Sequence, residues 1–148
     1  MKISYRKRIP EQDDLYLLQL SQQYLSHYLP AWMWKNQAFL QELNRSSRVI
    51  ILLGPEQQTI GYVAYSWISK SQVHFDYAVI EGTYQGKGYA RQGLEALKQY
   101  LKGKGATSIH LYVHGKNKHA MTIYYQLGFR LRQRPTFLRP TYWMEMSI

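Results

Sequence analysis

The sequence contains no cysteine among its 148 residues, and it has only 9 acidic residues against 19 lysines and arginines. Without cysteine there can be no disulfide, no thiolate metal ligand and no cysteine nucleophile. The chain also lacks an apolar run long enough to cross a bilayer, and its N-terminus mixes charges with single apolar residues, unlike a signal peptide. We therefore expect a soluble cytoplasmic protein.

The formal net charge of +10 favours an anionic partner, such as nucleic acid, an acidic protein or a polyphosphate cofactor. Lysines and arginines are spread over residues 2–8, 87–104, 116–118 and 130–139. Such a scatter does not form the single basic stripe that is typical of nucleic-acid-binding domains, so nucleic acid is an unlikely partner. The alternative is that the surface is basic but otherwise ordinary.

The order of the predicted elements indicates one domain over residues 1–148. They are a strand at 3–5, helices at 10–30 and 32–44, strands at 48–53, 60–68 and 73–80, a helix at 90–103, a strand at 108–113, a helix at 117–127 and closing strands at 129–134 and 141–148. A helical crossover joins the fourth and fifth strands, which makes them parallel. We expect an α/β (α+β) fold with a mixed, mostly antiparallel sheet of about seven strands, four helices, and a ligand where the parallel strands splay apart.

A glycine-rich segment, Gln-Gly-Lys-Gly-Tyr-Ala at 85–90, leaves a predicted strand and opens a helix. Several backbone N–H groups at such a helix start point to one place and bind an anion. Two familiar phosphate motifs do not fit, because Arg91 stands where the dinucleotide motif has its third glycine and Gly88 follows Lys87 where the P-loop needs Ser or Thr.

The pattern that does fit is Q-x-x-G-x-A at 85–90. A second pattern follows one helix and one strand later: Asn117, Ala120, Tyr124 and Leu-Gly-Phe at 127–129. With both patterns in order, the chain resembles the GCN5-related N-acetyltransferase (GNAT) superfamily over about residues 73–130. The resemblance implies acetyl transfer from acetyl-CoA to an amine of a small molecule or a protein. It also implies a monomer or a homodimer that has no membrane partner.

The same resemblance implies roles for individual residues. The turn at 85–91 would hold the coenzyme A pyrophosphate, the Ile80 backbone would pair with the pantetheine arm, Asn117 would touch that arm, and Tyr124 would face the sulfur. The implied cofactor-binding residues are Ile80, Gln85, Gly86, Lys87, Gly88, Tyr89, Ala90, Arg91 and Asn117.

Acetyl transfer to an amine calls for a base and an acid. Tyr124 is the candidate acid, because a phenol with a pKa near ~10 is protonated at neutral pH; the alternative is a tyrosine that only packs. His74 corresponds to the glutamate base of the histone-acetylating members, although it too could be structural. Asp76 lies two residues further on, on the same face of the predicted strand, and could instead bind the cationic form of the acceptor. Glu81 is a third candidate base, and a chain of water molecules could replace any of them.

His110 and His114 lie about 13 Å apart along a predicted strand, too far to share one metal ion, and we expect no metal. Because cysteine is absent, direct transfer in a ternary complex is favoured over an acetylated enzyme. Two alternatives stay open: a non-catalytic module that binds coenzyme A or another polyanion, and a basic nucleic-acid-binding domain. The sequence does not identify the acceptor, but the basic composition disfavours polyamines unless acidic residues gather locally.

Overall fold

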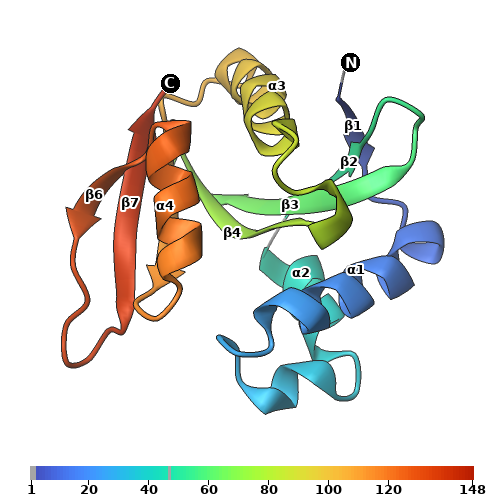
Figure 1. The fold of residues 1–148 in the computed structure, drawn as a ribbon, viewed down its shortest axis with the longest axis horizontal. Helices are drawn as coiled ribbons and strands as arrows, with labels where there is room; N and C mark the ends of the chain where they lie inside the picture. Colours follow the sequence, from blue (N-terminus) through green and yellow to red (C-terminus); the bar gives the residue numbers. More distant parts are fainter. Residues whose placement is uncertain (1–2, 47) are drawn as a thin grey trace.

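In the computed structural model, which describes residues 3–46 and 48–148, seven strands form one mixed sheet in the order β1-β2-β3-β4-β5-β7-β6 (Figure 1). The strands are β1 Ser4–Lys7, β2 Arg48–Leu53, β3 Thr59–Trp67, β4 Gln72–Ile80, β5 Ser108–His114, β6 Arg130–Gln133 and β7 Thr141–Ser147. The α-helices are α1 Pro10–Leu25, α2 Ala38–Ser46, α3 Tyr89–Gly103 and α4 Lys118–Leu127, with 3-10 turns η1 Ala31–Trp34 and η2 Gly82–Tyr84. The predicted fold class is confirmed. Across the described ranges, no helix is long and apolar enough to span a membrane.

The pairing of β4 with β5 is parallel, as the helical crossover predicted, whereas all other neighbouring strands are antiparallel. The parallel ladder is short. It joins Gln72–Phe75 to Ser108–Leu111, and the residues beyond it, 76–80 on β4 and 112–114 on β5, form no ladder with each other. The two strands therefore separate at their carboxyl ends and leave backbone groups of β4 without a neighbouring strand on that side.

The helices cover the two faces of the sheet unequally (Figure 1). On one face, α3 and α4 pack over most of the sheet, and Leu94, Leu97 and Leu101 form the buried stripe of α3. On the other face, α1 and α2 bury Leu17 and Phe39 against β2, β3 and the end of β4. Each such side chain contributes roughly 1.5–3 kcal/mol by its burial. No helix covers this second face over β5, β7 and β6 in the part of the chain that the structure describes.

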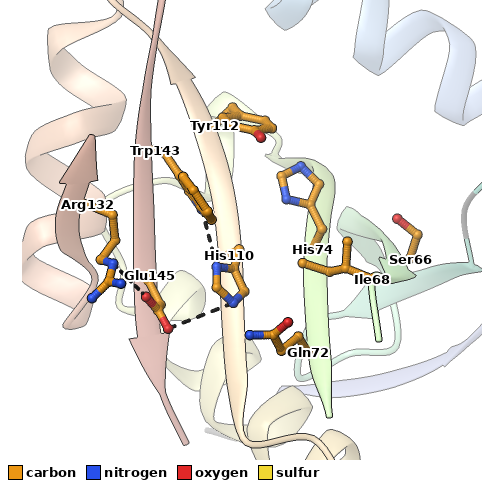
Figure 2. Close-up of a pocket in the computed structure, with 9 residues that line it drawn as sticks. All are labelled: Ser66, Ile68, Gln72, His74, His110, Tyr112, Arg132, Trp143 and Glu145. Atoms are coloured by element: carbon orange, nitrogen blue, oxygen red, sulfur yellow. Dashed lines mark hydrogen bonds and ion pairs between the residues drawn. The ribbon is translucent and has the colours of Figure 1, made fainter. Parts of the chain in front are cut away.

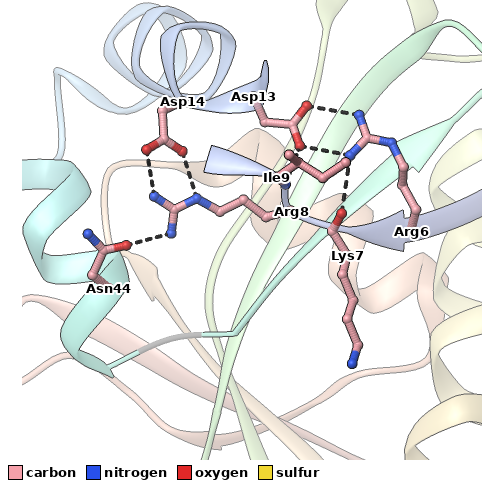
Figure 3. A network of polar contacts seen from close by, with 7 residues as sticks. All are labelled: Arg6, Lys7, Arg8, Ile9, Asp13, Asp14 and Asn44. Atoms are coloured by element: carbon pink, nitrogen blue, oxygen red, sulfur yellow. Dashed lines mark hydrogen bonds and ion pairs between the residues drawn. The ribbon is translucent and has the colours of Figure 1, made fainter. Parts of the chain in front are cut away.

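Two arginines fix the start of α1 to the end of β1 (Figure 3). Arg6 binds Asp13 through two N–H···O bonds of 2.8 Å, and the Asp13 side chain is only 3% exposed. Arg8 binds Asp14 in the same two-pronged way, and its third nitrogen donates to Asn44 of α2 at 2.8 Å. The hydrogen bonds from Arg6 lower the pKa of Asp13, so the carboxylate stays charged. Because a buried carboxylate such as Asp13 left without its partner costs about 3 kcal/mol or more, this joint holds α1 in place.

The connection between the first two helices differs from the prediction. The first helix ends at Leu25 instead of continuing to Pro30, and Trp32 lies in the separate turn η1. Asn36 and Gln37 have φ angles of 54° and 60°, which are incompatible with a right-handed helix, so α2 begins only at Ala38. Hydrophobic spacing could not reveal this break, because it depends on backbone conformation at two polar residues.

Candidate active site

The predicted strand-turn-helix context of the glycine-rich segment is present between β4 and α3. Gly86 and Gly88 have φ angles of 77° and 81°, a region that side chains rarely adopt. A Cβ atom at either position would meet nothing within 4 Å, so the outer side of the turn is open. Gly88 caps α3 without a side-chain acceptor, which leaves the first N–H groups of the helix for another partner. With the exposed Lys87 between the glycines, the turn fits a bound diphosphate.

Side chains on either side of the turn fasten it to neighbouring elements. Gln85 donates from Nε2 to the carbonyl of Ile80 at 2.8 Å, which ties the turn back to the end of β4. Arg91 donates from Nη2 to the carbonyl of Gln126 at 2.8 Å and so links α3 to the last turn of α4. The Tyr89 side chain is buried in the core, so only the backbone of this residue can contact a ligand at the turn. Gln85 and Arg91 thus have structural partners in addition to their predicted contacts with a ligand.

Two tyrosines of helix α1 bind residues 81 and 82, which lead from β4 into the glycine turn. Tyr24 accepts a hydrogen bond from the backbone N–H of Gly82, and a Cβ atom at Gly82 would collide with this phenol oxygen. Tyr16 donates to Glu81 at 3.2 Å, and burial together with Glu81 raises the pKa of Tyr16. Glu81, the third candidate base, is therefore bound to a phenol. The sequence predicted no such role for Tyr16 or Tyr24, because their partners lie 65 and 58 residues away along the chain.

Helix α4 brings Asn117 and Tyr124 to the face of α3. Asn117 caps the helix, since its Oδ1 accepts from the N–H of Ala120 at 3.2 Å. Tyr124 is half-buried against Phe129, with ring centroids 5.6 Å apart, whereas Tyr125 points away and is exposed. Burial raises the pKa of Tyr124 to about 12. The phenol is therefore protonated at neutral pH and can act as a proton donor.

On β4, His74 and Asp76 lie two residues apart and share a face, as the alternation of a strand predicts, and a bulge begins at Asp76. The register of β3 with β4 shifts by one residue at Asp76, which makes Asp76 the extra residue of a bulge. Ser66 donates to the Asp76 carboxylate at 3.0 Å. The ring of His74 lies 4.9 Å from that of Tyr112, and burial lowers the pKa of His74 although Asp76 partly opposes this. His74 is thus a neutral imidazole that can accept a proton.

A histidine that the sequence analysis did not connect with this site lies beside His74. His110 occupies the same register position on β5 and is 3% exposed. Its Nδ1 accepts from the indole N–H of Trp143 at 3.2 Å, and its Nε2 lies 3.9 Å from Glu145 (Figure 2). The same Nε2 lies 2.9 Å from Ser108 Oγ. Trp143 and Glu145 come from β7, so only the long-range pairing of three strands assembles the group.

His74, His110, Tyr112, Trp143 and Glu145 help to line a cavity of about 530 Å³ on the face that α1 and α2 leave uncovered (Figure 2). His110 and Tyr112 alternate along β5 with residues of the α3 core, so they point to the face opposite α3 and α4. Tyr124 belongs to the α3 and α4 side. The candidate acid and the candidate base therefore lie on opposite faces, with the separation of β4 and β5 between them. Among residues 3–46 and 48–148, no group of three His, Asp or Glu side chains could hold a metal ion.

Comparisons with known proteins show the family and the fold of the chain. A family model described as the acetyltransferase (GNAT) family matches residues 13–129. The N-acetyltransferase YycN of Bacillus subtilis is 35% identical over 75 residues, which is 46% of this chain and 47%, or about half, of YycN. The PaiA N-acetyltransferase of Thermoplasma acidophilum, solved with coenzyme A, has a TM-score of 0.78 at 18% identity over 100% of both chains. The spermidine N-acetyltransferase of Vibrio cholerae, solved with CoA and spermine, has a TM-score of 0.77 at 16% identity over 99% of this chain and 95% of its own. By the family match and the shared fold, the chain belongs to the GNAT family of acetyltransferases.

Proposed function

We propose that this protein is an acetyl-CoA-dependent N-acetyltransferase that transfers the acetyl group to an amine by direct attack in a ternary complex. The observation that carries the proposal is the open glycine turn at the carboxyl ends of two diverging parallel strands. Coenzyme A in the solved PaiA and spermidine N-acetyltransferases, which share the fold, supports it.

In this proposal the turn formed by residues 85–91 binds the coenzyme A diphosphate through its backbone amides, with Lys87 and Arg91 adding positive charge. The pantetheine arm lies along β4 near Ile80, where the strand has no neighbour on the β5 side, and adds to the sheet as a further strand would. The Asn117 amide nitrogen contacts the same arm while its oxygen caps α4.

Tyr124 supplies the acid. The amine nitrogen forms a bond to the acetyl carbonyl carbon, the carbon–sulfur bond breaks, and its electron pair goes to sulfur. Tyr124 then donates its phenol proton to the departing thiolate. Burial raises the pKa of Tyr124, which keeps the phenol protonated at neutral pH but also makes it a weaker acid, so its hydrogen bond to the developing thiolate is the larger part of this role.

His74 supplies the base on the other face. An amine must lose a proton during the transfer, and a neutral imidazole accepts that proton directly or through one water molecule. Asp76, bonded to Ser66 at 3.0 Å, lies close enough to His74 to bias its charge and to attract an acceptor ammonium. The acceptor thus enters from the face of His74 and the thioester from the face of Tyr124.

The test is to follow free thiol and N-acetylated product in parallel while acetyl-CoA and an amine are varied. Direct transfer predicts equal amounts of both products and intersecting initial-rate lines, whereas an acetylated enzyme gives parallel lines. If coenzyme A binds but no amine is acetylated, the protein is a binding module instead. If the protein binds nucleic acid in a salt-dependent way and does not bind coenzyme A, it is a basic nucleic-acid-binding domain.

A further inference from the structure

Four rings line the cavity beside His74: those of His74 itself, His110, Tyr112 and Trp143. Tyr112 is 52% exposed, and its ring centroid lies 4.9 Å from that of His74 and 6.2 Å from that of Trp143. Ile68, which is 57% exposed, lies at the rim. The Arg139 guanidinium lies over one part of the Tyr112 ring, 5.9 Å from its centroid. The exposed aromatic surface that remains in this concave site favours a flat apolar body, which stacks on it and displaces water.

The charges of the same cavity nearly cancel. Glu145 is 22% exposed, and its carboxylate lies 3.0 Å from the Arg132 guanidinium. The lowered pKa of His74 keeps this imidazole neutral at neutral pH. Glu145, and Asp76 beside His74, can each attract one ammonium group, but a further ammonium group, as in spermidine, would meet Arg132 and a chain of net charge +10.

From these two observations we propose that the cavity is the acceptor subsite and that it takes a primary monoamine with an aromatic body, in preference to a polyamine. This inference rests on the proposed acetyl transfer. The amine end lies toward His74 and the separation of β4 and β5, and the ring of the acceptor lies between Tyr112, Trp143 and Ile68.

The first experiment compares kcat/KM for three amines with acetyl-CoA: 2-phenylethylamine, n-propylamine and spermidine. We expect 2-phenylethylamine to exceed each of the other two at least about tenfold, the scale of discrimination by an apolar pocket. Ile68→Ser lowers only the value for 2-phenylethylamine, and Leu15→Ser, at another exposed apolar position that lies on α1 and does not line the cavity, changes none of them. Equal values for the three amines, or a preference for spermidine, would overturn the inference.

The second experiment measures binding without turnover, so that failure of the inference is distinguishable from failure of acetyl transfer. The chain has 5 histidines, which makes their ring resonances in NMR spectra practical to assign from single substitutions. Titration with 2-phenylethylamine should shift the resonances of His74 and His110 and leave that of His119, on α4, unchanged. If these shifts occur while no amine is acetylated, the site stands and the proposed function falls. If His74 and His110 do not shift, or spermidine shifts them equally, the inference is wrong whatever the turnover.

Discussion

Trp143 of β7 donates its indole N–H to Nδ1 of His110 on β5, with 3.2 Å between the two nitrogens. An indole nitrogen only donates, so Nδ1 must be the unprotonated nitrogen of the imidazole. The neutral form of His110 therefore carries its proton on Nε2, which faces Ser108 and Glu145. This bond fixes the tautomer of the residue next to the proposed base His74.

The Trp143→Phe variant tests that bond. It keeps a ring in the cavity but removes the donor, so we expect a single tautomer of His110 in the wild type and a mixture in the variant. The ¹⁵N chemical shifts of the imidazole distinguish protonated from unprotonated nitrogens. Trp34→Phe is a matched control, because Trp34 Nε1 is buried without a hydrogen-bond partner among the described residues. A protonated Nδ1 in wild-type His110 at neutral pH would contradict the assignment.

A pH profile tests His74 as the base. Burial lowers its pKa below the ordinary 6.5, and the groups that face it are Asp76, His110 and Tyr112. The profile of kcat/KM should therefore be flat just above pH 6.5 and fall only at lower pH, where His74 takes up a proton. His74→Gln should lose this acid limb and about 10²-fold or more in rate. An unchanged limb in the variant would assign it to another group.

The lowered pKa of His74 also makes the free energy of unfolding depend on pH. As pH falls, the unfolded chain protonates its exposed histidine before the folded chain does, so the contribution of His74 to the free energy of unfolding is complete above pH 6.5 and is lost as pH falls through the lower, folded value. The loss should be smaller in His74→Gln, which can be measured by denaturant unfolding at several pH values.

Tyr124→Phe separates chemistry from packing. The ring and its contact with Phe129 remain, and the hydroxyl has no hydrogen bond within the described ranges, so the melting temperature should change little. If the phenol protonates the thiolate, kcat falls about 10² to 10⁴-fold while CoA affinity stays nearly constant. A thioester with a more acidic thiol should recover part of the lost rate. Equal kcat in the two proteins would leave the acid to water.

Most of the fold was predictable because each element has a local pattern. Leu94, Leu97 and Leu101 recur at helical spacing, and Gly128, with a φ of 107°, caps α4 directly after the predicted helix end at 127. The crossover through α3 was enough to predict a parallel pair. Nothing local marked the bulge at Asp76, since the alternation of β4 looks regular until its register with β3 is known.

The candidate site was predictable only where one segment forms it. The glycine turn is continuous in sequence and was placed correctly between β4 and α3. The group around His110 draws on β4, β5 and β7, so spacing along the sequence relates His110 only to His114 on its own strand and does not indicate His74 on the next. Likewise, the bond from Arg91 to Gln126 joins two helices whose packing no spacing rule indicates.

The most direct test of the account is the affinity for coenzyme A, measured by titration calorimetry on the wild type, Gly88→Val and Gly103→Ala. Both glycines have open space where a Cβ would lie, but only Gly88 has a positive φ and faces the proposed diphosphate. The account predicts binding by the wild type, at least about a tenfold loss in Gly88→Val, equivalent to about 1.4 kcal/mol, and no change in Gly103→Ala. A folded Gly88→Val protein that binds coenzyme A as tightly as the wild type would show that the turn is not the cofactor site.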